Sequence, residues 1–95
     1  DTDPAYKDIS SIKLLKRVKN LLSVHGYKVV NIDSVICAER PKLAPYIDEM
    51  RKNIAETLSI AVDRVSVKAT TTEGLGFEGK GEGISAQAVC LIEKI

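Results

Sequence analysis

The chain has 95 residues, 44% hydrophobic and 28% charged, which is the composition of one globular domain and too short for two. Fourteen basic and 13 acidic residues leave a net charge of +1, so there is no field to hold a nucleic-acid backbone. No apolar run approaches the roughly 18 residues that cross a bilayer. We expect a soluble protein without nucleic-acid or membrane partners, whose Cys37 and Cys90 are buried free thiols in a reducing compartment.

The first half of the chain predicts a helix followed by a strand. Residues 9–25 carry apolar side chains at helical spacing, namely Ile12, Leu15, Val18 and Leu22. Asp8 or Ser10 can cap the start of this helix, and Gly26 suits the left-handed residue that follows its end. The β-branched stretch 27–38 predicts a strand that is well buried because both of its faces are partly apolar.

The second half predicts one helix and two strands. Pro45 suits the first turn of a helix whose apolar positions are spaced by three and four, namely Ile47, Met50, Ile54 and Leu58. Residues 64–71 and 84–92 alternate with period two, which predicts two strands. The order helix, strand, helix, strand, strand predicts a single domain over residues 1–95: an α/β (α+β) two-layer sandwich, with a mixed sheet and helices on one face.

The stretch "KATTTEGLGFEGKGEG", residues 68–83, holds five of the six glycines. Residues 74–79 spell the G-x-G-x-x-G dinucleotide motif, but that motif needs a helix next, and a strand is predicted there. Residues 74–80 also match the start of a phosphate-binding P-loop, yet Gly81 replaces the hydroxyl residue that would bind magnesium. Neither motif is complete.

Phosphate can be bound without either motif. Glycine amides and the hydroxyls of Thr70, Thr71 and Thr72 are donors, and Glu73 can share a divalent cation with a phosphate. The same residues also fit a threonine-rich strand end followed by a flexible turn. Spacing alone leaves both interpretations open.

Two other stretches and one residue are candidates for a site. The loop "AERPKLAP", residues 38–45, can present main-chain groups to a base, with Lys42 free for a phosphate, or can be a plain strand-to-helix connection. The opening "DTDP" is typical of a turn. His25 falls at a helix end, where a positive charge is favourable, and no catalytic triad or paired-cysteine metal spacing can be assembled.

The segments "DTDPAYK", "ICAERPKLAPYIDEMR" and "VSVKATTTEGLGFEGKGEGISAQAV" resemble the 2-C-methyl-D-erythritol 2,4-cyclodiphosphate synthase family along the whole chain. The resemblance implies homotrimers of a ferredoxin-like unit, in the bacterial cytoplasm or in the plastid of a eukaryote. It implies a lyase of the non-mevalonate isoprenoid pathway. A phosphate of 4-diphosphocytidyl-2-C-methyl-D-erythritol 2-phosphate attacks the β-phosphorus, and CMP leaves as the cyclodiphosphate forms.

The resemblance also implies a set of substrate-binding residues. The cytidine loop would be Ala38, Glu39, Arg40, Pro41, Lys42, Leu43 and Ala44. The residues at the diphosphate would be Thr70, Thr71 and Thr72, with Thr71 catalytic through transition-state stabilisation, and Glu73 would bind magnesium or manganese. The residues around the methylerythritol hydroxyls would be Asp1, Thr2 and Asp3.

Phe77 and Lys80 match positions near the substrate and the trimer axis, where an isoprenoid diphosphate can sit. Lys80 stands where the family usually has Arg, which removes a bidentate phosphate donor.

The family's zinc ligands lie upstream of the Asp-Thr-Asp-Pro segment and are absent from this chain, whose single histidine is His25. The chain therefore resembles the C-terminal portion of the enzyme, and we expect it to be inactive alone. The alternative is a noncatalytic nucleotide-binding or assembly module that uses the same two loops. A preference for cytidine over other nucleotides would favour the synthase lineage.

Overall fold

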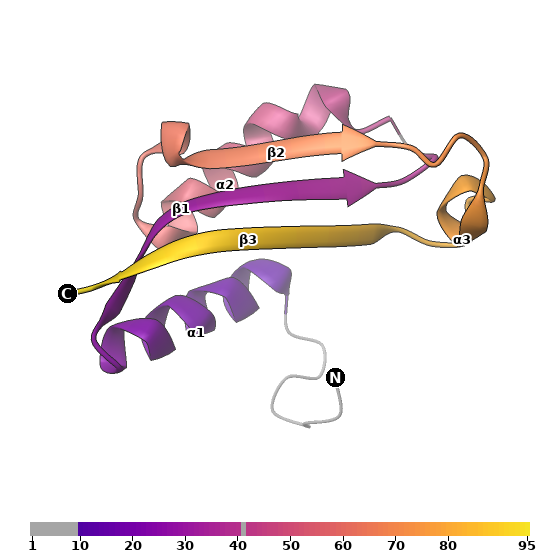
Figure 1. Ribbon diagram of the computed structural model, residues 1–95. Helices are drawn as coiled ribbons and strands as arrows, with labels where there is room; N and C mark the ends of the chain where they lie inside the picture. Colours follow the sequence, from indigo (N-terminus) through magenta and orange to yellow (C-terminus); the bar gives the residue numbers. More distant parts are fainter. Residues whose placement is uncertain (1–9, 41) are drawn as a thin grey trace.

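The computed structural model describes residues 10–40 and 42–95. In chain order, the elements are α1 (Ser11–Val24), β1 (Tyr27–Cys37), the 3-10 turn η2 (Ala44–Tyr46), α2 (Ile47–Leu58), the 3-10 turn η3 (Val62–Arg64), β2 (Val65–Thr70), the short α3 (Gly76–Gly79) and β3 (Ser85–Lys94). The predicted order of helices and strands is confirmed (Figure 1). Only η2, η3 and α3, each three or four residues long, were not predicted.

The three strands form one mixed sheet in the order β2-β1-β3. The central strand β1 runs parallel to β2, with Ile32 opposite Val65, and antiparallel to β3, with Ile32 opposite Cys90. The parallel pair is connected through α2, as a parallel connection requires a crossover. The sheet is therefore mixed, as predicted.

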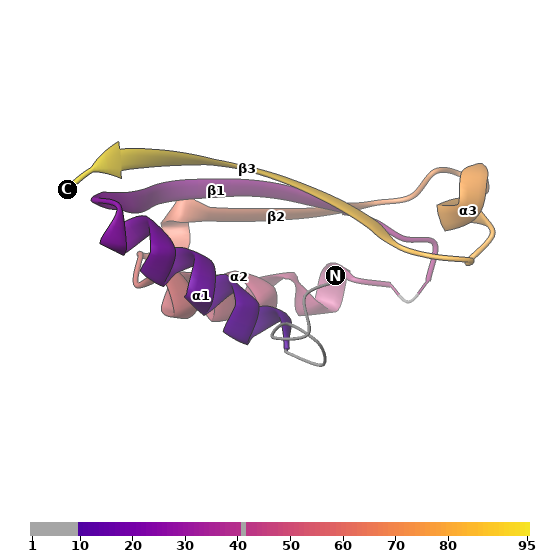
Figure 2. The same cartoon turned by 90° about the horizontal axis from the view of Figure 1, so that it is seen from below.

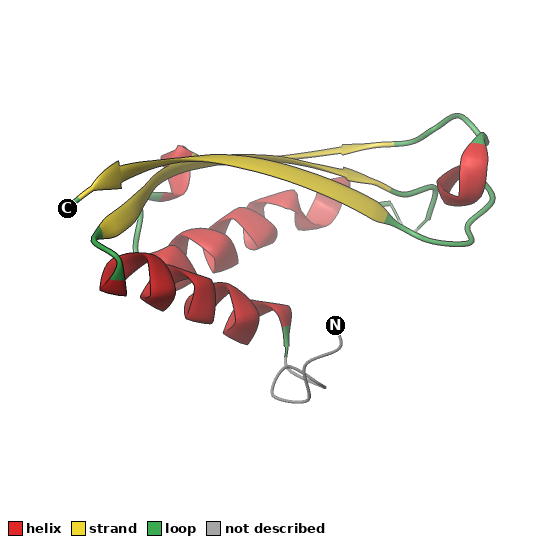
Figure 3. Cartoon of the chain, turned by 60° about the horizontal axis from the view of Figure 1, so that its bottom comes forward, coloured by secondary structure: helices red, strands yellow, loops and turns green. Residues whose placement is uncertain are grey.

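Both long helices lie on one face of the sheet, and no element covers the other face within the described residues (Figures 2 and 3). The core is small and lies between α2 and the parallel strands. Its buried members are Ala55, Val65 and Val67, surrounded by Ile36, Ile47, Met50, Ile54 and Ile60. Val65 is the most enclosed of them, with 2% of its surface exposed. The two-layer sandwich is thus held together mainly by α2.

The two ends of α1 carry the capping residues that the sequence predicts. Ser10 Oγ accepts a hydrogen bond from the Lys13 N–H at 3.2 Å, while Asp8 lies outside the described residues. The helix ends at Val24, one residue before the predicted end; His25 is its C-cap residue, and Gly26 follows with a φ of +85°. Lys19 Nζ donates to Ser59 Oγ at 2.8 Å and joins α1 to the end of α2.

Two predictions about burial are wrong. No residue of β1 is buried, although both of its faces were expected to be covered, because one face of the sheet is open. Cys90 is exposed and Cys37 is half-buried, although both are free thiols as expected. The reason is topological, since Cys90 lies on β3, an outer strand that pairs with β1 alone. In the part of the chain described here, no helix is long and apolar enough to cross a bilayer.

Candidate functional site

The two parallel strands end side by side, and this fixes where the predicted loops begin. Cys37, the last residue of β1, is opposite Thr70, the last residue of β2. The Ala38 N–H continues the ladder by donating to the Thr70 carbonyl at 3.1 Å. The described residues of the segments 38–44 and 70–84 therefore leave the same end of the sheet as neighbours, to the right in Figure 1.

The threonines differ in how their hydroxyls are engaged. The Thr70 hydroxyl makes a long bond to the Thr71 carbonyl, 3.4 Å, and Thr71 Oγ1 accepts from the Glu73 N–H at 3.3 Å. Thr72 Oγ1 instead donates to the Leu75 carbonyl within the turn. Thr70 and Thr71 are exposed, so their hydroxyls can reach a ligand, whereas the Thr72 hydroxyl is used to hold the turn.

The glycine loop folds back on itself. Its four-residue helix α3 is closed by the Gly79 N–H, which donates to the Leu75 carbonyl at 3.1 Å, and the Glu82 N–H donates to the Phe77 carbonyl at 2.8 Å. A Cβ added at Gly79 would lie 2.2 Å from the backbone carbon of Gly74, so only glycine fits there. The helix lies inside the G-x-G-x-x-G stretch and β3 follows it, as expected for a chain without the dinucleotide motif.

Two contacts position the glycine loop. Ser85 Oγ, at the start of β3, donates to Glu78 Oε2 at 2.8 Å. A Cβ added at Gly81 would lie 3.6 Å from Arg40 Nη2, so the Arg40 side chain reaches from the 38–44 segment to this loop. The two segments therefore form one continuous surface beyond the strand ends.

Most of the residues expected to bind substrate lie on this surface. Ala38 is buried, Glu39 and Leu43 are half-buried, and the more exposed members are Arg40, Lys42, Ala44, Thr70, Thr71, Glu73, Phe77 and Lys80. Glu39 Oε2 is buried and has no hydrogen-bond partner. Asp1, Thr2, Asp3 and Pro41 lie outside the described residues.

His25 lies at the opposite end of the fold from this surface. It is the residue before Gly26, whose carbonyl accepts from the N–H of the C-terminal Ile95 at 2.8 Å. His25 and the threonine segment are separated by the full length of β1, from Tyr27 to Cys37. His25 is therefore not brought to the candidate site.

Glu73 is the described residue that best fits a metal at this surface. It has a φ of +55° and an exposed side chain at the turn after Thr72. A magnesium ion is commonly held by one or two carboxylates together with phosphate oxygens and water, so one carboxylate is chemically sufficient. No group of three or more His, Cys, Asp or Glu side chains that could hold a metal occurs within residues 10–40 and 42–95. These residues fit a shared magnesium ion and do not fit a zinc site.

Two features of the loops and the sheet are not predicted by the sequence patterns. The approach of the Arg40 side chain to the Gly81 backbone depends on how two loops face each other, for which a single sequence gives no signal. Asp33 forms an ion pair with Lys68 on the open face of the sheet, with Nζ and Oδ1 2.5 Å apart. The acidic residue Asp33 in the middle of a β-branched stretch was a hint of this ion pair in the sequence.

The sequence of the chain matches a known protein family. The sequence profile described as the YgbB family matches residues 1–93. The chain belongs to the YgbB family. Two relatives of this YgbB chain are named 2-C-methyl-D-erythritol 2,4-cyclodiphosphate synthase. The one from Chloroherpeton thalassium is 60% identical over 95 residues, and the one from Syntrophotalea carbinolica is 62% identical over 94.

This YgbB chain spans only part of those relatives. The matches cover 100% and 99% of this chain, but only 60% and 57% of the two relatives. The 2C-methyl-D-erythritol 2,4-cyclodiphosphate synthase structure from Plasmodium vivax matches with a TM-score of 0.86 and 32% identity, over 90% of this chain and 57% of that one.

Two further solved structures share the fold. The bifunctional IspDF of Campylobacter jejuni matches with a TM-score of 0.92 and 38% identity, over 100% of this chain and 26% of that one. A synthase structure described as a bound form with CDP matches with a TM-score of 0.84 and 26% identity, over 97% of this chain and 59% of that one.

Proposed function

We propose that this YgbB chain carries the cytidine and diphosphate subsites of a 2-C-methyl-D-erythritol 2,4-cyclodiphosphate synthase, a lyase of the non-mevalonate isoprenoid pathway. The observation that carries the proposal is the adjacency of the two loops at the ends of β1 and β2, where Ala38 is hydrogen-bonded to Thr70. A solved relative of the same fold is described as CDP-bound. The cytidine end would lie along residues 38–44 and the diphosphate along residues 70–73.

The proposed reaction needs no protein nucleophile. An oxygen of the substrate's 2-phosphate forms a bond to the β-phosphorus, the bond between that phosphorus and the bridging oxygen breaks, and CMP leaves with the bridging oxygen. Catalysis of this kind depends on positioning and on neutralising charge. Thr70 and Thr71 would donate hydrogen bonds to the diphosphate, with Thr71 stabilising the transition state. Lys42 would supply positive charge near the CMP phosphates.

Glu73 would bind magnesium or manganese shared with the diphosphate oxygens. When bound, such an ion withdraws charge from the phosphate oxygens and fixes their orientation. The zinc of the whole enzyme would require ligands that the described residues do not supply. We therefore expect this 95-residue chain alone to release no CMP, while keeping its affinity for cytidine nucleotides.

We propose that the chain assembles as a homotrimer in the cytoplasm and that the open sheet face is where copies meet. The face exposes large apolar side chains, including Val89 at 68% and Leu91 at 57%. Apolar surface of this kind, opposite a core with few buried residues among those described, favours association. Phe77 and Lys80 would then lie near the axis, where an isoprenoid diphosphate could bind. Asp1, Thr2 and Asp3 would contact the methylerythritol hydroxyls.

The proposal is tested by titrating the chain with CDP and UDP, with and without magnesium. We expect CDP to bind more tightly than UDP and magnesium to strengthen binding. Glu73→Gln should weaken the magnesium-dependent part of the CDP affinity by roughly 10- to 100-fold, because one charge-assisted interaction is worth roughly 1.5–3 kcal/mol. Glu56→Gln, on α2 away from the loops, is the control and should bind like the parent chain.

Equal affinity for both bases would favour the alternative, a noncatalytic nucleotide-binding or assembly module. Unchanged magnesium dependence in Glu73→Gln would refute the metal assignment.

A further inference from the structure

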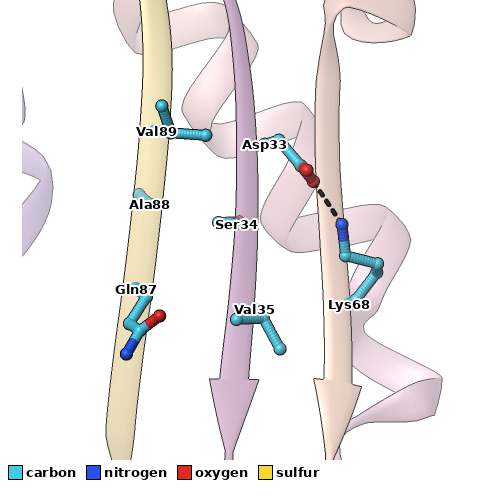
Figure 4. A pocket seen from close by; sticks show the side chains of 7 residues that line it. All are labelled: Asp33, Ser34, Val35, Lys68, Gln87, Ala88 and Val89. Carbon is cyan, nitrogen blue, oxygen red and sulfur yellow. Dashed lines mark hydrogen bonds and ion pairs between the residues drawn. The ribbon is translucent and has the colours of Figure 1, made fainter.

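The centre of the open sheet face holds a polar cluster that the proposed nucleotide site does not use. It lines a hollow of about 180 Å³, and Figure 4 shows its side chains on all three strands. Asp33 and Lys68 form the ion pair across β1 and β2, and Gln87 of β3 lies beside Val35. The hollow lies on the face opposite the helices, and the described nucleotide-site residues are not among those that line it.

The strand register explains why these two charges meet. Asp33 is opposite Ser66, and Lys68 is opposite Val35, so Asp33 and Lys68 are diagonal neighbours on the same face. Hydrogen bonding to Lys68 is the main cause that lowers the pKa of Asp33, with Ser66 contributing a further bond. The side chains are 53% and 57% exposed, so the isolated chain gains little from the pair.

The surroundings of the pair are apolar. Val89 is opposite Asp33 on β3, and Leu91 is two residues further along the same face. The lining also includes Val35. A pair of charges inside such a surface becomes important only if something covers it, because covering removes the water that screens the charges.

The charge balance of the face restricts what can cover it. Its centre carries one acid and one base, so a nucleic acid, an anionic membrane or a strongly charged protein finds no excess charge of opposite sign. A second copy of this chain carries the same neutral polar centre and the same apolar side chains. The net charge of +1 opposes self-association only weakly.

We propose that the Asp33–Lys68 pair determines the assembly of this chain, because a second copy can cover this part of the face only while neither charge is left without its partner. The inference rests on the assembly proposed above. Removing one partner would leave an uncompensated charge in the contact. Replacing both with apolar side chains would keep the contact and remove the requirement. The pair thus makes association conditional on an intact partner on each copy.

The test is sedimentation equilibrium of the full 95-residue chain over a range of concentrations. We expect Asp33→Asn and Lys68→Met each to raise the concentration needed for half-assembly by about tenfold or more, since an unpaired covered charge is strongly unfavourable. The double variant Asp33→Leu with Lys68→Met should return to within about threefold of the parent, because apolar replacement of a covered pair is often neutral. Far-UV circular dichroism of each variant reports whether the monomer is folded.

The matched control is the second ion pair between strands. Lys28 and Glu93 are 3.0 Å apart on β1 and β3, but they line a different hollow, beside Ile60 and Arg64. Glu93→Gln should change the concentration needed for half-assembly by less than about twofold, as expected for an exposed pair.

The outcomes separate the two proposals. If folded Asp33→Asn and Lys68→Met assemble at the same concentrations as the parent chain, the role of the pair is overturned. The proposal that the chain assembles through this face is not affected by that result. Failure of the double variant to recover would overturn the role of the pair as well. A parent chain that stays monomeric at every concentration would overturn the assembly itself, whatever the variants do.

Discussion

The two faces of the sheet have the same strands but opposite environments. Toward the helices, Val65 and Val67 are buried against α2. On the other face, Val89 has 68% of its surface exposed and the Asp33–Lys68 pair lies in the open. The fold of this chain therefore depends on one face of the sheet, and no described element covers the other face.

The strongest test of this difference uses the same substitution on each face. Val65→Ala should lower the free energy of unfolding by about 2–3 kcal/mol, because it removes two buried methyl groups and leaves a cavity. Val89→Ala should change it by less than about 0.5 kcal/mol, as for an exposed position. Chemical denaturation at concentrations where the chain is monomeric measures both. Equal losses would mean that the open face also belongs to the monomer's core.

The second test concerns the loop that leaves the sheet at the strand ends. Gly79→Ala would place a Cβ 2.2 Å from the Gly74 backbone, so the loop must rearrange. We expect CDP affinity to fall by about tenfold or more, because the hydroxyls and amides that we propose to bind the phosphates would move. Gly26→Ala is the control, since its Cβ would meet nothing within 4 Å and its site is at the far end of the sheet. Its φ of +85° costs some stability but should leave CDP affinity unchanged.

If Gly79→Ala binds CDP like the parent chain, the glycine loop does not form the phosphate subsite. If Gly26→Ala weakens CDP binding as much as Gly79→Ala does, the effect is global and says nothing about the loop. Titration calorimetry at a temperature where both variants are folded separates these results.

The smallest expected effect is the pH dependence of stability that arises from Asp33 on the open face. The pKa of Asp33 in the folded chain is below its ordinary value of 3.8, mainly because Lys68 donates a hydrogen bond to it. The unfolded chain therefore binds more protons in acid. The stabilising contribution of Asp33 is complete above pH 3.8 and is lost as the pH falls through the folded value.

Thermal unfolding of the parent and Asp33→Asn checks this. Their difference should shrink as the pH is lowered from neutral to below 3.8. A difference that stays constant over that range would show that the carboxylate of Asp33 contributes nothing through its charge.

Most of the fold was predictable because the signals were local. The period of apolar residues indicated both long helices, and alternation indicated residues 64–71 and 84–92 as strands, close to the observed Val65–Thr70 and Ser85–Lys94. Burial was less predictable. The apolar side chains of β1 and Cys90 predicted covered faces, but coverage depends on how many layers pack on the sheet, and periodicity does not record this.

The arrangement of the candidate site was predictable in part, for a different reason. The threonine and glycine residues stand next to one another in the sequence, so their shared loop was visible at once. Their proximity to residues 38–44 depends on the parallel pairing of Cys37 with Thr70, a contact between residues far apart in the chain. The approach of Arg40 to Gly81 and the ion pair of Asp33 with Lys68 also depend on residues far apart in the chain, which strand order and register bring together.

The most direct test of the central claim is a nuclear magnetic resonance titration of the isotope-labelled chain with CDP and magnesium. We expect the amide shifts to concentrate in residues 38–44 and 70–80. The amides of His25, Ile60 and Ile95 should not shift, since these residues lie at the other end of the sheet. Shifts that concentrate at that other end or on the open face, with residues 38–44 and 70–80 unaffected, would contradict it.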